Sequence, residues 1–188
     1  MSYEFNRSGK RKRGYDTEQV NEFLAFARDQ FANPTDSLLT AETVRTKRFK
    51  LVKNGYYIAA VDSAMEKLED VFASRELEKT IELSGLDEFK EQLVSGQELL
   101  IRRASKGFRR KFKRRFFFFR GYNRKQVDRF CKKVSRHLKR GDDLSVRQVR
   151  LATFKAQRGG YAEYQVDAFI EKVIEVLQRE AILEKTSD

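Results

Sequence analysis

Apolar residues recur at intervals of three and four along most of the chain, which is the spacing of one face of an α-helix. The clearest such stripe consists of Val20, Phe23, Leu24, Ala27 and Phe31. Comparable stripes run through residues 61–72 and 166–177. No segment shows the alternation typical of a half-buried strand. The pattern therefore predicts an all-α fold in which each helix buries one face.

Residues that commonly begin helices refine this picture. Asp16 and Asn123 are N-cap residues, and a glutamine three residues later in each case predicts a capping box. Thr40 and Ser145 are N-cap candidates for two short helices. Besides the helix of the first stripe, the expected helices are 40–47, 57–83, 87–104, 145–152 and 162–184.

A fixed motif occurs four times: a Gly-Tyr pair, then a Val six residues after the Gly, then Asp or Asn. Repeated motifs at one spacing decide the architecture of a chain. The motif residues are Gly14, Tyr15, Val20, Gly55, Tyr56, Val61, Asp62, Gly121, Tyr122, Val127, Asp128, Gly160, Tyr161, Val166 and Asp167. The spacing places the three aspartates near helix N-termini, where a carboxylate is favourable to the helix dipole.

The four copies alternate in type, so copies one and two repeat as copies three and four. Phe5 and Phe112 stand nine residues before the Gly of the odd copies, and Phe49 and Phe154 stand six residues before the Gly of the even copies. We therefore expect two tandem halves, 1–72 and 112–188, joined by a charged helical linker, 73–111. Each Gly is expected in a turn, with a backbone conformation closed to other residues.

The motif resembles the DivIVA domain. Residues 13–24, 119–130 and 159–170 fit it closely, whereas the second copy departs at Tyr57 and Ala64. The layout is similar to the multi-repeat DivIVA-domain proteins of actinobacteria. That resemblance implies a non-enzymatic binding or scaffold protein linked to cell division or polar growth. It also implies peripheral membrane contact through an aromatic-Arg pair before Gly-Tyr.

Charge is concentrated in one segment. The formal net charge is +12, yet residues 102–140 alone hold 18 Lys or Arg and a single acid, Asp128. A focal basic patch indicates an anionic partner, which is a nucleic acid, an anionic lipid surface or an acidic protein. Together with this patch, the DivIVA resemblance implies an anionic membrane or proteins of the division and growth machinery as partners, with nucleic acid and self-association as open alternatives.

Four consecutive phenylalanines lie inside this basic segment and cannot all face one core. Three interpretations stay open: contact with membrane or partner, packing of the rings between the two halves, and stacking on nucleic-acid bases. The candidate binding residues are Phe116, Phe117, Phe118, Phe119, Arg120, Arg114, Arg115, Arg124 and Lys125. Phe119-Arg120 is the pair that the DivIVA resemblance identifies as membrane-contacting.

Nothing in the sequence indicates catalysis. The single His137 and the single Cys131 do not form a recognisable nucleophile pair. Phosphate-binding glycine motifs and metal-ligand spacings are missing from the sequence, so no cofactor or metal is expected. Cys131 is expected to be a small half-buried residue, with a reactive thiol favoured by the surrounding Lys and Arg as the alternative. No stretch reaches the ~20 apolar residues of a membrane span, and we expect a cytoplasmic protein, peripheral at the inner face of the membrane if the resemblance holds.

Overall fold

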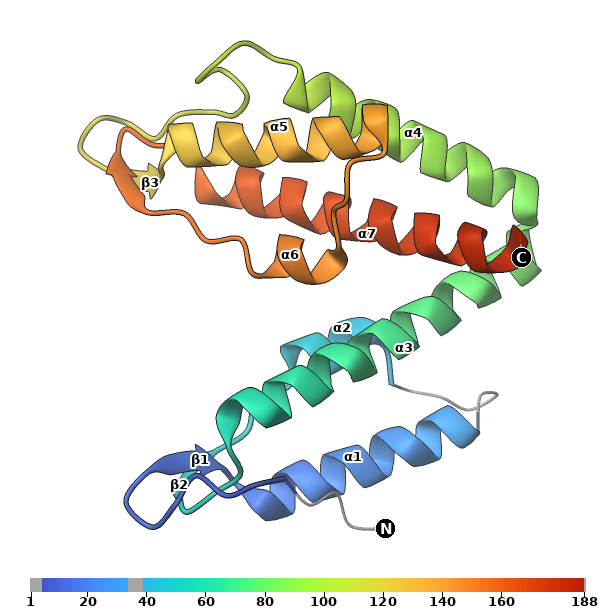
Figure 1. The fold of residues 1–188 in the computed structure, drawn as a ribbon, viewed down its shortest axis with the longest axis vertical. Coiled ribbons are helices and arrows are strands. Elements are labelled where there is room, and N and C mark those ends of the chain that lie inside the picture. The colour runs from blue at the N-terminus through green and yellow to red at the C-terminus, as the bar shows by residue number, and fades with distance from the viewer. Residues whose placement is uncertain (1–4, 34–38, 188) are drawn as a thin grey trace. The chain divides into compact units, whose positions relative to one another are not determined.

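The computed structural model describes residues 5–33 and 39–187 and is mostly helical, with 64% of residues in helices (Figure 1). This confirms the predominantly α-helical character that the apolar stripes predicted. Contacts divide the chain into two compact units, Met1–Lys79 and Thr80–Asp188. We call them unit 1 and unit 2 and describe each by itself.

Unit 1 combines two short strands with three helices. Along the chain come β1 (Arg13–Tyr15), α1 (Thr17–Ala32), α2 (Ala41–Thr46), β2 (Leu51–Lys53) and α3 (Ile58–Ser84), whose last turn belongs to unit 2. β1 pairs with β2 in an antiparallel two-stranded sheet that places Arg13 opposite Lys53. The sequence predicted no strand because three residues are too few to show an alternating pattern.

Unit 2 repeats this order of elements behind one additional helix. It contains α4 (Leu86–Ala104), β3 (Arg120–Tyr122), α5 (Arg124–Arg140), α6 (Val146–Arg150), β4 (Ala156–Arg158) and α7 (Glu163–Ser187). β3 and β4 form the second antiparallel pair, with Arg120 opposite Arg158. The order strand, helix, short helix, strand, long helix therefore occurs once in each unit.

The additional helix α4 differs from the expected linker 73–111. Its buried residues include Leu93, Leu100 and Ala104, which belong to the same core cluster as residues of α5 and α7. Gly96 allows close packing, since a Cβ there would lie 3.0 Å from Cγ2 of Val176. The charged segment carries an apolar helical stripe, so it joins the core of unit 2 and the boundary falls at residues 79–80.

The predicted N-caps are confirmed, but the predicted capping boxes are wrong. The Asp16 carboxylate accepts hydrogen bonds from the backbone N–H groups of Glu18 and Gln19, and Thr40 and Ser145 cap α2 and α6 in a similar way. The Gln19 side chain, however, accepts from the backbone N–H of Lys50, 3.0 Å away. Gln126 does the same with Lys155 at 2.7 Å. These glutamines thus join α1 and α5 to the segment before the second strand of each unit.

The Gly-Tyr pairs form strands and bridges, which corrects the prediction of Gly-Tyr turns. In unit 1 the backbones of Tyr15 and Tyr56 exchange two hydrogen bonds, of 3.0 and 2.7 Å. A Cβ on Gly14 would lie 2.2 Å from the Tyr56 carbonyl oxygen. None of the four motif glycines has a positive φ, so the predicted unusual backbone conformation is wrong. Glycine is needed because the two backbones approach too closely for a side chain.

The motif tyrosines reach across to the other copy in the same unit. The Tyr161 hydroxyl donates to Oδ1 of Asp128 at 3.0 Å, and the Tyr56 hydroxyl donates to Oδ1 of Asn21 at 3.3 Å. Burial and a hydrogen bond to Asp62 raise the pKa of Tyr15, and the pKa of Tyr122 is raised alike by burial and Asp167. The motif aspartates therefore accept hydrogen bonds from motif tyrosines, and they also lie near helix N-termini as expected.

Candidate interaction surface

The four phenylalanines form a turn immediately before β3. The backbone N–H of Phe119 donates to the carbonyl of Phe116 at 2.8 Å, which closes the turn. We call Phe116–Phe119 the aromatic turn. Its rings are 59–73% exposed, and Phe118 contacts Phe117 and Phe116 with centroids 4.6 and 5.7 Å apart. Such exposure places these rings outside the core of unit 2.

The aromatic turn is held from both sides. Gly159 N–H donates to the Phe119 carbonyl at 3.0 Å, and Arg115 N–H donates to the Gly160 carbonyl at 2.8 Å. Further back, the Phe112 ring is 6% exposed and packs edge-on against Tyr161 and Phe169. The buried Phe112 therefore fixes the chain just before the exposed rings of the aromatic turn.

Cations surround the aromatic turn. Among the predicted cations, the exposed ones are Arg114, Arg115, Arg120 and Lys125. The Arg115 guanidinium lies 5.8 Å from the Phe119 ring centroid. The pairing of β3 with β4 adds Arg158 opposite Arg120. The two residues are far apart in sequence, so the sequence did not predict this neighbour. The structure thus places Arg114, Arg115, Arg120 and Arg158 beside the aromatic turn at one end of the β3–β4 ribbon, whereas Lys125 lies on α5.

Arg124 differs from the other predicted cations. It begins α5, and its side chain is only partly exposed. Its backbone N–H donates to Oε1 of Gln157 at 3.1 Å, while its buried Nε has no hydrogen-bond partner. Arg124 therefore lies behind the exposed surface, at the junction of α5 and β4.

One lysine of the basic segment is buried and serves the fold. Lys111 is 8% exposed, and its Nζ donates to the carbonyls of Ala104 and Lys106 near the end of α4. Its backbone N–H donates to the Tyr161 hydroxyl at 3.1 Å, and that hydroxyl donates to Asp128. Burial and the nearby Asp128 raise the pKa of Tyr161. This network orders the segment below the aromatic turn, and no sequence signal set Lys111 apart from its neighbours.

Unit 1 has a turn at the corresponding place, with a different composition. Lys12 N–H donates to the Gly9 carbonyl at 3.0 Å, and β1 follows as β3 follows the aromatic turn. We call residues 6–13 the basic loop, because this segment contains five Lys or Arg, no acid and no apolar residue. Lys12 and Arg13 are exposed. The two units therefore present an aromatic and a purely cationic version of the same local structure.

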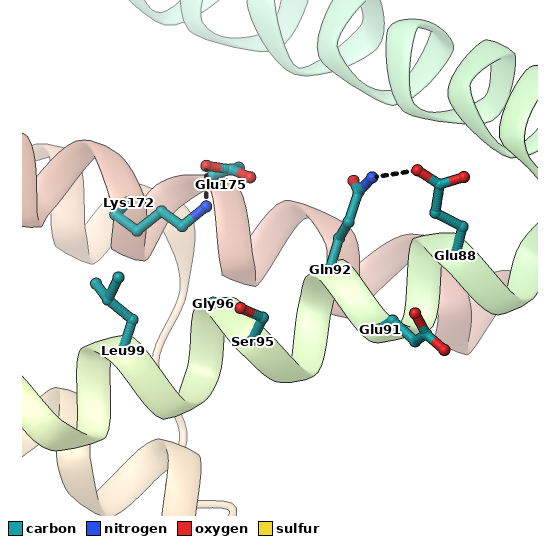
Figure 2. Close-up of a pocket in the computed structure, with 8 residues that line it drawn as sticks. All are labelled: Glu88, Glu91, Gln92, Ser95, Gly96, Leu99, Lys172 and Glu175. Carbon is teal, nitrogen blue, oxygen red and sulfur yellow. Dashed lines mark hydrogen bonds and ion pairs between the residues drawn. The ribbon is translucent and has the colours of Figure 1, made fainter.

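A groove runs along α4 and α7 in unit 2 (Figure 2). Its cavity has a volume of about 570 Å³. Lys172 pairs with Glu175 at 2.8 Å, and the Gln92 amide donates to Glu88 at 3.1 Å. These side chains pair with one another along the groove, and Gly96 lies where α4 packs against Val176 and Lys172 of α7.

The two residues considered for nucleophilic chemistry lie apart from these surfaces. Cys131 is fully buried, and burial raises its pKa to about 12, so the thiol stays protonated. Cys131 is therefore more deeply buried than the half-buried residue that the sequence predicted, and the reactive-thiol alternative is wrong. His137 lies 2.9 Å from Oε2 of Glu180 and 2.7 Å from the Asp142 carbonyl. Both partners accept, so both ring nitrogens must carry protons to satisfy them.

Two opposing influences act on the pKa of His137. Burial is the largest single one, and it alone would lower the pKa because it favours the neutral imidazole. The contacts with Glu180 and Asp142 outweigh it, and the pKa is raised above its ordinary value. Gln97 donates to the other Glu180 oxygen at 2.7 Å. The histidine therefore joins α5 to α7, with α4 attached to the same carboxylate.

No family model, no curated protein and no solved structure matches the chain. In residues 5–33 and 39–187, no helix combines the length and apolar character that a bilayer crossing requires. Within the same residues, no group of three or more His, Cys, Asp or Glu side chains is arranged to hold a metal ion.

Proposed function

We propose that the protein is a non-enzymatic, DivIVA-like binding or scaffold protein that contacts anionic membrane through the aromatic turn. One observation carries the proposal: four phenylalanines, each more than half exposed, are displayed in one turn among exposed cations. A contiguous exposed apolar patch ringed by basic residues is typical of an interfacial membrane contact. The resemblance of the repeated motif to the DivIVA domain supports a role near division or polar growth machinery.

The magnitudes favour combined insertion and electrostatic attraction. Each Lys or Arg near an anionic leaflet contributes about 1 kcal/mol. Full burial of one Phe side chain contributes about 1.5–3 kcal/mol, so partial insertion of two rings is comparable to two or three cations. Arg114, Arg115 and Arg120 are close enough in sequence to the rings to act at the same time. Salt should weaken the ionic part and leave the apolar part.

A second candidate function is nucleic-acid binding by the basic segment 102–140. The observation that favours it is a stripe of exposed cations on α5, made of Lys125, Arg129, Lys132 and Arg136. Such a stripe suits phosphate contacts, and the aromatic turn would supply rings for base stacking. Arg136 is partly committed, because it pairs with Asp142 at 3.2 Å.

Co-sedimentation with anionic and neutral vesicles distinguishes the two candidates. We expect the wild type to bind anionic vesicles and the variant Phe118→Ser/Phe119→Ser to lose most of that binding. The matched control is Phe26→Ser, which removes another partly exposed Phe, 44% exposed, from α1. Circular dichroism should show that all three proteins are folded. Wild-type protein that stays in the supernatant at low salt contradicts the proposal.

A further inference from the structure

The basic loop of unit 1 and its neighbouring strand form a strongly cationic surface. Exposed side chains on this surface are Arg7, Lys10, Arg11, Lys12, Arg13, Lys50 and Lys53. Residues 47–57, which supply the last two, also contain no acid. Across the described residues, Lys10, Arg11 and Lys12 have no carboxylate paired with them. Their charges are therefore available to a partner.

The geometry of the surface is set by the two short strands. Arg13 and Lys53 face each other in the antiparallel pair, where neighbouring strands lie about 4.8 Å apart. The turn closed by Lys12 and Gly9 extends the cations beyond β1. Arg7 is fixed at its base, since it donates to the Asn54 carbonyl at 3.1 Å and lies over the Tyr56 ring. The result is a narrow ribbon that carries cations on both strands and at its tip.

The comparison with unit 2 indicates which polyanion this surface fits. At the place where unit 2 displays four phenylalanines, unit 1 displays Gly9, Lys10, Arg11 and Lys12. The basic loop holds no ring or aliphatic side chain that could insert into a lipid layer. A purely ionic contact gains most from a partner of high linear charge density, and duplex nucleic acid carries one charge per about 1.7 Å of its axis.

From these features we infer that unit 1 contains a nucleic-acid-binding surface that contacts the phosphate backbone without reading sequence. The contacts are charge-assisted hydrogen bonds from Lys and Arg to phosphate oxygens. This surface is separate from the aromatic turn, so its activity does not require vesicle binding. Where the proposed function also holds, the protein can attach nucleic acid to an anionic membrane.

The test measures binding to a short mixed-sequence DNA duplex over a range of salt concentrations. For Lys10→Ser/Arg11→Ser/Lys12→Ser, the slope of log affinity against log salt should fall by about 2.7, or ~0.9 for each phosphate that the variant no longer neutralises. Affinity near 0.1 M salt should fall by between about two and three orders of magnitude. The matched control is Lys67→Ser/Lys79→Ser/Lys90→Ser, which removes the same charge from exposed positions on α3 and α4 and should bind nearly as the wild type.

Each other outcome overturns the inference. Wild type without duplex affinity at low salt removes the inference, and so does a control variant that loses as much affinity as the basic-loop variant. A basic-loop variant that keeps duplex affinity but loses vesicle binding shows a lipid surface instead. Both variants replace exposed side chains, and circular dichroism checks their folding. Phe118→Ser/Phe119→Ser, assayed in parallel, reports on the proposed function separately, because it should keep duplex affinity.

Discussion

Replacing Gly121 by Ala should disrupt the paired backbones on which unit 2 is built. The added Cβ would lie 2.2 Å from the Tyr161 carbonyl oxygen, whereas ordinary contacts begin at 3.4 Å. The two strands must therefore separate by about 1 Å, because a carbonyl that is hydrogen-bonded in the ribbon cannot turn away. Tyr122 and Tyr161 exchange two backbone hydrogen bonds, of 3.0 and 2.9 Å, and both would be stretched or broken.

The expected destabilisation follows from these contacts. A buried polar group left without its partner costs about 1–3 kcal/mol, and two such groups are affected. Displacement of Tyr161 also disturbs its packing against Phe112. We therefore expect the free energy of unfolding of unit 2 to fall by about 3–5 kcal/mol, in the range of severe single substitutions.

Urea denaturation followed by circular dichroism measures this decrease, and amide hydrogen exchange locates it in unit 2. The matched control is Gly107→Ala, where the nearest atom is 3.9 Å from the added Cβ. It should change the free energy of unfolding by less than about 0.5 kcal/mol. If Gly121→Ala is as stable as Gly107→Ala, the close backbone approach does not exist and the account of the Gly-Tyr motif is wrong.

Three further predictions concern buried or partly buried side chains of unit 2. Tyr161→Phe should lower the free energy of unfolding by about 1–3 kcal/mol, because Asp128 loses a hydroxyl donor in a buried site; thermal denaturation that shows no change contradicts this. The raised pKa of His137 means that its contacts stabilise the fold fully at pH below the pKa of an unfolded histidine, and that this stability is lost as pH rises through the folded pKa. His137→Gln should therefore flatten the dependence of stability on pH, and an unchanged pH profile argues against the contact with Glu180. Cys131 should react with a thiol reagent at pH 8 only as fast as the protein unfolds, since its pKa is about 12; fast labelling of the native protein contradicts its burial.

Local sequence patterns predicted the helices well, because helix formation and capping depend on residues that are close in sequence. The stripe that begins at Val20 defined α1, and Asp16 marked its first turn. Four consecutive phenylalanines implied exposure, since no helix or strand can turn all of them towards one core, and the rings are indeed exposed. Such inferences need only the geometry of one element.

Features that depend on distant partners could not be predicted in the same way. Gly14 is needed because it meets the backbone of Tyr56, and nothing in the sequence near Gly14 shows that meeting. Lys111 and Lys113 look alike in sequence, yet only Lys111 is buried. The sequence predicted the helix that contains Leu93, Leu100 and Ala104, but its many charged residues favoured a linker over a core helix.

The membrane contact is tested most directly by giving the aromatic turn the residues of the basic loop. The variant Phe117→Lys/Phe118→Arg/Phe119→Lys copies Lys10, Arg11 and Lys12 from the corresponding turn of unit 1 and adds three positive charges. Binding to anionic vesicles is then measured at low salt and at about 0.5 M salt, where ionic attraction is largely screened. Our account predicts that the wild type keeps appreciable binding at high salt and that the variant, despite its greater charge, does not. A variant that binds as well as the wild type under both conditions would show that the rings do not insert, and the central claim would be wrong.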